Sequence, residues 1–280
     1  MRKICIILLL TLITSAAFAD TDDDGKLKKS GWIYTPTTYA HIMYQNRKSS
    51  FIESNMMVPF WEDERNVTYA KLQNYMREGP RQTIGFGVGW NHLTQGRQAI
   101  FGVNAFYDRL RSFDSKLFSQ VIVGAQAQTT HWVYQAHVYQ PVVDTHVQVV
   151  GGPSMQSFQN VQLRDGLEQI MPGFDAQVGY RIGRNVALET YLGGYYFSAH
   201  GAQTVTGPQA HIVFSLQNPF GFSGIMAFLA RNVAFEVGTS YDKPNDFSWY
   251  GGIRWTVGLG KQDLTGMEWH MMDENRQLFD

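Results

Sequence analysis

Eight histidines are the side chains of this sequence best suited to acid–base catalysis. A hydrolase needs a nucleophile or an activated water, a base within hydrogen-bond reach, and a group that orients the base. None of the histidines lies in a Gly-x-Ser-x-Gly, His-Glu-x-x-His or comparable motif; they are His41, His92, His131, His137, His146, His200, His211 and His270. Because histidines scattered in this way are typical of loops and interfaces, the sequence predicts no enzyme.

Two acid pairs could also be considered as catalytic groups. Asp108 with Asp114, and Asp242 with Asp246, each flank an expected loop tip, where solvated turn carboxylates are common. No spacing of His, Asp and Glu indicates a metal site, and we expect no cofactor. Residues 66–68, Asn-Val-Thr, form an N-glycosylation sequon, to which we assign no function.

Residues 84–108 form two limbs of period-two alternation around a polar turn, which predicts a β-hairpin. One face is apolar and aromatic: Ile84, Phe86, Val88, Trp90, Ala99, Phe101, Val103, Ala105 and Tyr107. The other is mostly small or polar, although Ile100 and Phe106 interrupt it: Gly85, Gly87, Gly89, Asn91, Gly102, Asn104 and Asp108. A soluble sheet would normally carry Lys, Glu and Thr on its outward face, whereas a membrane barrel places apolar residues toward lipid and small polar ones toward a lumen. We therefore interpret Asn104, Phe106 and Asp108 as a structural row that lines the lumen.

The start of the chain predicts export. Arg2 and Lys3 precede an apolar run at residues 4–13, and residues 17–19 supply the small residues of a signal-peptide cleavage site. Cys5, the only cysteine, lies in this signal, so the mature chain has no thiol chemistry. No other stretch approaches the roughly 18 apolar residues of a membrane helix. If the exported chain enters a membrane, it must do so as a closed barrel.

Composition agrees with this interpretation. Aromatic residues make up 14% of the chain, and the formal net charge is −1, which becomes −3 once Arg2 and Lys3 are lost with the signal. Mean hydropathy is negative, at −0.24, as expected when alternation hides barrel strands. Nothing in the charge distribution suggests nucleic acid as a partner.

The sequence predicts one all-β domain with a segment at each end: a signal peptide at 1–19, a periplasmic leader at 20–50, an antiparallel transmembrane β-barrel at 51–260, and a tail at 261–280. Residues 141–171 predict a long surface loop with an extra strand near 145–150, and residues 220–230 a strand or an internally packed loop. The count is eleven or twelve, and an even number is expected. The expected strands are Phe51–Trp61, Asn66–Met76, Gln82–Asn91, Gln98–Asp108, Lys116–Gln128, Trp132–Tyr139, Phe174–Ile182, Val186–Phe197, Pro208–Gln217, Val233–Tyr241 and Ser248–Leu259.

The run Gly102-Val103-Asn104-Ala105-Phe106-Tyr107-Asp108 resembles the GVNAFYD signature of the inverse autotransporter β-domain, the membrane anchor of intimin- and invasin-type adhesins. Weaker landmarks stand in order around it. They are Val58-Pro59-Phe60 with Tyr69, Leu72 and Tyr75, the strand Ile84–Trp90, Gly124-Ala125 followed by Gln126 where the family has Glu, Ala136–Tyr139, and Pro172-Gly173-Phe174-Asp175.

The resemblance, over residues 51–259, implies a 12-stranded barrel that holds an extended segment in its lumen and presents a C-terminal passenger outside the cell. It also makes Gly102, Asn104, Phe106, Tyr107 and Asp108 motif residues with a structural role at the lumen. About 21 residues follow Leu259, so we expect no passenger.

Three function classes remain open at this stage. The first is an outer-membrane anchor with an adhesin-like role at the cell surface, and the second is a passive porin-like channel. The third is an exported soluble β-protein, which the aromatic strand ends disfavour. The first class implies outer-membrane lipid and the barrel assembly machinery as partners, with a host or cell-wall ligand reached through the loops.

Overall fold

A computed structural model of the 280-residue chain describes residues 37–45, 51–63, 65–77, 81–95, 98–112, 115–143, 146–148, 155–158, 161–164, 167–182, 186–216, 233–244 and 246–258. The predicted signal peptide, the first part of the leader, residues 220–230 and the C-terminal tail lie outside these ranges. None of the described segments is a helix long and apolar enough to cross a membrane.

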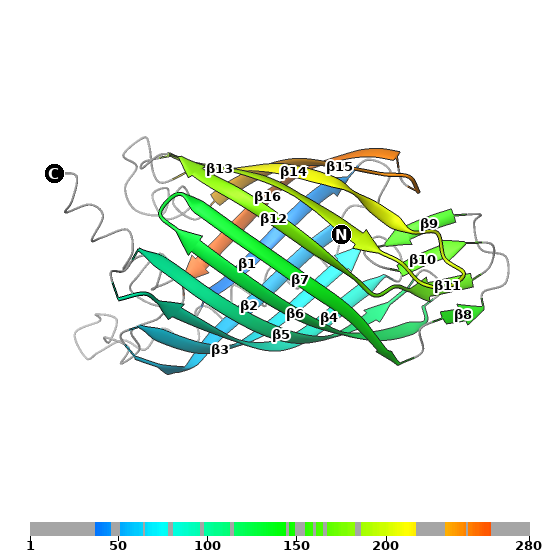
Figure 1. Cartoon of the computed structure of the whole chain (residues 1–280), viewed down its shortest axis with the longest axis horizontal. Coiled ribbons are helices and arrows are strands. Elements are labelled where there is room, and N and C mark those ends of the chain that lie inside the picture. The colour runs from blue at the N-terminus through cyan, green and yellow to red at the C-terminus, as the bar shows by residue number, and fades with distance from the viewer. Residues whose placement is uncertain are drawn as a thin grey trace, which may run out of the picture.

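Twelve antiparallel strands close into a barrel, which confirms the predicted fold class (Figure 1). The strand order around the wall is β1-β16-β15-β14-β13-β12-β7-β6-β5-β4-β3-β2. The barrel strands are β1 Thr37–Gln45, β2 Phe51–Glu62, β3 Asn66–Arg77, β4 Gln82–Leu93, β5 Ala99–Arg111, β6 Leu117–Thr129, β7 Trp132–Val143, β12 Gly173–Ile182, β13 Val186–Phe197, β14 Val205–Leu216, β15 Val233–Asp242 and β16 Asp246–Gly258.

The predicted start of the barrel at residue 51 comes one strand too late. β1 lies in the segment expected to be a leader, and it closes the barrel by pairing with β2 on one side and β16 on the other. Its alternation is real, since Ile42 and Tyr44 are exposed on the outside and His41 is buried inside. A single short strand that follows Pro36 and carries an inward histidine gives too weak a pattern to be recognised locally.

A second, four-stranded sheet is inserted between β7 and β12. It consists of β8 His146–Gln148, β9 Met155–Phe158, β10 Val161–Arg164 and β11 Leu167–Ile170, in the order β8-β11-β10-β9. The extra strand expected near residues 145–150 is therefore present as β8, but the rest of the expected loop contains three more strands. Each has four residues, too few for alternation to stand out.

The two ends of the barrel differ. The β8–β11 sheet lies at one end, at the right of Figure 1, which we call the loop end. The inserted sheet follows β7, the seventh barrel strand, so β1 begins at the other end of the barrel. Because the number of barrel strands is even, β16 ends there too, and we call this the terminal end.

The outer surface of the barrel is apolar, as the hairpin pattern predicted. Phe86 is 58% exposed and Val103 is 52% exposed, whereas Gly87 and Gly102, next to them in sequence, face inward. Aromatic side chains gather on the outside near both ends. Those near the terminal end are Phe60, Trp61, Trp90, Trp132, Tyr134, Tyr180, Phe214 and Phe235; those near the loop end are Tyr44, Tyr107, Phe174, Tyr196, Tyr241, Phe247 and Trp249. Such a belt between two aromatic girdles is the surface of a protein that sits in lipid.

Three prolines lie within strands. Pro141 lies beyond the expected end of its strand, and Pro208 was the expected first residue of β14, which begins three residues earlier. Pro59 and Pro141 are next to register shifts in the β2–β3 and β6–β7 ladders. Pro208 lies where β14 pairs with β13 but does not yet pair with β15. Since proline cannot donate to a ladder, it is tolerated at such irregular or single-sided positions, and β7 and β14 are longer than predicted for this reason.

Candidate functional site

The interior of the barrel is the first place to look for chemistry, and its glycines shape it. Gly85, Gly87 and Gly89 face inward on β4, and each lies under a large side chain of a neighbouring strand. A Cβ on Gly87 would lie 2.1 Å from the Phe106 ring, and one on Gly89 would lie 2.3 Å from the Tyr69 ring. The predicted glycine row is therefore a set of recesses that hold large inward side chains against the wall.

Asp108 is the centre of a buried polar group formed by three strands. It is 2% exposed, and its Oδ1 accepts a hydrogen bond from Gln73 Nε2 at 2.9 Å. Gln120 on β6 is 1% exposed and lies directly across the ladder from Asp108. Gly85 makes room for this group, because a Cβ there would lie 2.0 Å from Asp108 Oδ1.

The five motif residues divide between the two faces of β5. Gly102, Asn104, Phe106 and Asp108 face the interior, as predicted. Tyr107 faces outward and is 49% exposed, as the alternation predicted, and its hydroxyl donates to Ser119 Oγ at 2.9 Å. It is a girdle residue and does not line the lumen.

A charged group lies at the seam where β1 closes the barrel. The ring of His41 lies between two carboxylates, with Nδ1 3.7 Å from Glu53 Oε2 and Nε2 3.7 Å from Glu236 Oε2. Asn55 Nδ2 donates to Glu53 at 2.8 Å, and Tyr250 Oη donates to Glu236 at 3.1 Å. The two His41 contacts link β1 to β2 and, across β16, to β15, so the group spans the seam where the barrel closes.

A second interior group lies on β7 and β12. His137 Nδ1 is 2.9 Å from Asp175 Oδ1, and Tyr139 Oη donates to Asp175 Oδ2 at 2.5 Å. Two residues away along each strand, Gln177 Nε2 donates to Gln135 Oε1 at 2.6 Å. These bonds run between neighbouring strands, along the wall.

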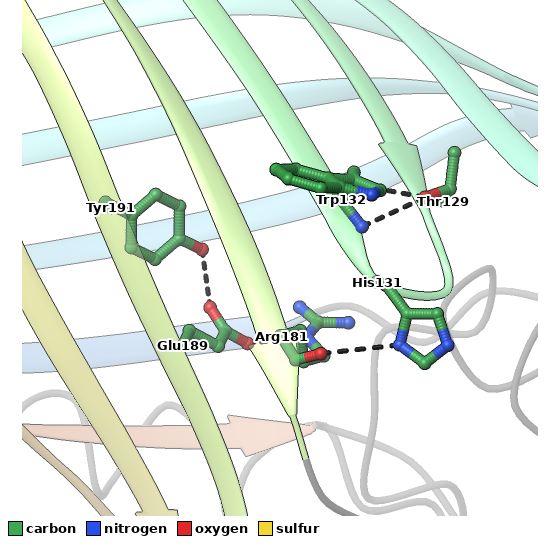
Figure 2. Close-up of polar contacts among 6 residues, drawn as sticks. All are labelled: Thr129, His131, Trp132, Arg181, Glu189 and Tyr191. Atoms are coloured by element: carbon green, nitrogen blue, oxygen red, sulfur yellow. Dashed lines mark hydrogen bonds and ion pairs between the residues drawn. The ribbon is translucent and has the colours of Figure 1, made fainter.

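Figure 2 shows a third group, near the terminal end. Arg181 Nε donates to Glu189 Oε1 at 2.7 Å, and Tyr191 Oη donates to Glu189 Oε2 at 2.5 Å. The Tyr191 ring stacks on His211 at 4.3 Å between centroids. The β6–β7 turn next to this group is closed by Thr129 and Trp132, whose backbone N–H donates to Thr129 Oγ1 at 2.9 Å.

None of these groups forms a catalytic set. The His137–Asp175 pair has the base and the orienting acid of a triad, but the hydrogen bonds of the His92, His131 and His137 rings go to Asn66, the Arg181 carbonyl and Asp175, none of them a nucleophile. Asp242, 1% exposed, accepts a hydrogen bond from Tyr195 Oη at 2.6 Å, while its suggested partner Asp246 is exposed in the turn. Asp114 lies outside the described residues. No group of three metal-ligating side chains occurs within the described ranges.

The Asp63 carboxylate caps the β2–β3 turn at the terminal end. The backbone N–H of Arg65, the largest cause, and the side chain of Asn66 hydrogen-bond to it and lower its pKa below 3.8. Asn66 Oδ1 also lies 2.9 Å from His92 Nδ1. The amide of the sequon is thus occupied in holding a turn.

Sequence reasoning placed the wall of the interior correctly but missed the seam group. His41 lay in the expected leader, and Glu53 and Glu236 are separated by more than 180 positions in the sequence. The alternation along β2 and β15 could have predicted that both glutamates face inward. That they lie on either side of His41 follows only from the pairing of β1 with β2 and β16.

Comparison with family models gives one match. The model of the inverse autotransporter β-domain matches residues 27–197, more than half of the chain. The match includes β1, in agreement with its place in the barrel. No curated protein matches the sequence.

Solved structures with a similar fold are membrane barrels. One, reported under "Unveiling the Mechanism Behind the in-meso Crystallization of Membrane Proteins", has a TM-score of 0.53 at 12% identity and covers 79% of this chain and 83% of its own. An outer membrane channel from Pseudomonas putida F1 has a TM-score of 0.50 at 7% identity, with 85% and 99% covered. Outer membrane phospholipase A from Escherichia coli has a TM-score of 0.43 at 11% identity, with 80% and 98% covered. At these identities the likeness concerns the fold alone.

Proposed function

Because the chain belongs to the inverse autotransporter β-domain family, an outer-membrane barrel family, we propose that it acts as a non-enzymatic membrane anchor with an adhesin-like surface at its loop end. The observation that carries this proposal is the β8–β11 sheet, which extends the barrel at the end opposite the one where β1 begins and β16 ends (Figure 1).

The orientation follows from the connections. Outer-membrane barrels have short turns on the periplasmic side and longer loops outside. The β2–β3 and β6–β7 connections at the terminal end are tight turns, whereas the longest connection, between β7 and β12, lies at the loop end. The proposal therefore places the β8–β11 sheet at the cell surface.

The β8–β11 sheet is held to the barrel by contacts at the end of β11. Ile170 and Met171, at the end of β11, are fully buried, and Met171 packs against Phe197 and Val205. Gln169 Nε2 donates to the backbone carbonyl of His200 at 3.1 Å. A surface that is ordered before a partner arrives loses less conformational entropy on binding, which suits recognition.

The interior supports an anchor more than a catalyst. Its charged and amide groups bond to one another along the wall, in pairs such as Gln73–Asp108, His137–Asp175 and Arg181–Glu189. This use of polar groups stiffens a barrel. A passive channel is the second candidate, because the same polar side chains line the lumen.

The test has two parts. An epitope tag between Gly151 and Gly152 should be detected on intact producing cells, while the same tag beside Arg65 should be detected only after permeabilisation. Replacing residues 144–171 with a short turn should abolish attachment of these cells to epithelial monolayers or to immobilised peptidoglycan. Unchanged attachment would refute the adhesin-like role. Steady conductance of the purified barrel in a planar bilayer, without attachment, would establish the channel instead.

A further inference from the structure

The lipid-facing surface of the barrel carries a pair of charges at one place. Among the outward-facing side chains of the twelve described strands, Arg109 and Arg111 are the only lysine, arginine, aspartate or glutamate residues. Both are exposed, at alternate positions at the end of β5. Within the described part of the chain, no carboxylate forms an ion pair with either guanidinium.

The depth of this pair is set by the aromatic girdle. Tyr107, a girdle residue at the loop end, precedes Arg109 by two positions on the same outward face. With a rise of about 3.3 Å per residue and a tilt of about 45°, Arg109 and Arg111 lie roughly 5 and 9 Å beyond Tyr107 along the membrane normal. This is the level of the lipid headgroups.

Polar neighbours complete a patch at that level. Arg111 lies across the ladder from Gln82 of β4, and Arg109 lies across from Ser119 of β6. Lys116 is exposed in the next turn, which is closed by Ser112 N–H donating to the Lys116 carbonyl at 2.8 Å. With Asp114 as the one acid of this hairpin, residues 109–117 carry a net charge of +2.

The other half of the loop end is different. There the exposed outward residues near the strand ends are aromatic, including Phe174, Tyr196, Tyr241, Phe247 and Trp249. These side chains suit the acyl boundary but offer an anion nothing beyond hydroxyl and indole groups. The cationic patch is therefore confined to the β4–β6 side of the barrel.

An arginine on the lipid face is strongly destabilising at the bilayer midplane and nearly neutral near the interface. At headgroup depth the anion available to an unpaired guanidinium is phosphate, which arginine binds in a bidentate way. We propose that Arg109, Arg111 and Lys116 form a binding site for the phosphate groups of a lipid in the outer leaflet. The assignment to the outer leaflet rests on the orientation given under the proposed function, whereas phosphate binding itself does not.

The experiment is a lipid titration of the full chain in detergent micelles, followed by native mass spectrometry. The probes are bisphosphorylated lipid A, the same lipid without its phosphates, and inorganic phosphate. We expect binding of the bisphosphorylated lipid, and affinity about tenfold lower for Arg109→Gln/Arg111→Gln, as expected when charge-assisted hydrogen bonds are lost. Arg65→Gln, which removes an exposed arginine at the terminal end, is the matched control and should bind like the wild type. Arg109→Lys/Arg111→Lys should retain most of the affinity.

Several results would overturn the proposal. Equal binding of the dephosphorylated lipid by the wild type would do so without any variant, so the test does not depend on the folding of a mutant. Equal weakening by Arg65→Gln would show a general charge effect. Binding of inorganic phosphate as tight as that of the lipid would indicate a small-anion site and refute the assignment to lipid. Because no arm measures attachment, failure here would leave the anchor proposal untouched.

Discussion

Replacing Gly85 with alanine should destabilise the barrel. The new Cβ would lie 2.0 Å from Asp108 Oδ1 and 2.7 Å from Gln73 Cγ, and both side chains are buried and bonded to each other. Overpacking costs about 1–3 kcal/mol, and loss of a hydrogen bond to a carboxylate costs about 1.5–3 kcal/mol. Alanine recovers about 0.5–1 kcal/mol of backbone entropy. The expected net loss is about 2–5 kcal/mol in the free energy of unfolding.

Equilibrium urea unfolding in lipid vesicles, followed by tryptophan fluorescence, measures this loss. Gly251→Ala is the matched control, because the nearest atom to its Cβ is Glu236 O at 3.9 Å, an ordinary contact; its effect should stay within about 0.5 kcal/mol. In the double variant Gly85→Ala/Asp108→Ala the clash has lost its main partner, so the two losses should be less than additive by at least about 1 kcal/mol. Additive losses, or a Gly85→Ala variant as stable as Gly251→Ala, would refute the view that the glycines are recesses for inward side chains.

Two further predictions test the lipid face and a turn. Val237→Arg, at the centre of β15 where Val237 is 62% exposed, should cost about 2–4 kcal/mol in the same unfolding assay, against about 0–1 kcal/mol for Tyr241→Arg in the girdle; equal costs would contradict the assigned membrane level. Asp63 has a folded-state pKa below 3.8 because the backbone N–H of Arg65 and the Asn66 side chain bond to its carboxylate, so its stabilisation is present above pH 3.8 and is lost as pH falls through the lower folded-state pKa. Asp63→Asn should therefore be less stable than the wild type at neutral pH and equal to it below that pKa, and a difference independent of pH would show that the carboxylate charge plays no part.

Much of the wall was predictable because alternation is a local property. The barrel strands from β2 onward follow from the parity of residues such as Phe86 and Gly87, or Val123 and Gly124, each of which faces as expected. The predicted count of about twelve is confirmed. β1 was missed because its partners, β2 and β16, lie at opposite ends of the sequence, and pairing rather than pattern identifies it.

The contents of the interior were predictable only by residue type. That Asp108 would face inward could be inferred from β5 alone, but its partner Gln73 lies 35 positions away on a strand that is not adjacent to β5. The position of this glutamine depends on two strand registers and on the absence of a side chain at Gly85. His41, Glu53 and Glu236 depend in the same way on closure of the barrel.

The buried polar groups follow from the environment of the barrel and need not imply catalysis. Lipid requires the outward positions to be apolar, so the charged residues of the strands lie inside, where a group without a partner would be costly. Asp108, Asp175 and Glu189 each accept a hydrogen bond from a side chain of another strand for this reason. The exception is outside, where Arg109 and Arg111 are exposed to the bilayer and, among the described residues, form no ion pair with a carboxylate. The outer surface is otherwise apolar, so two exposed arginines at headgroup depth need a partner from outside the protein. They are therefore better evidence of a ligand than the interior charges, which already bond to other side chains.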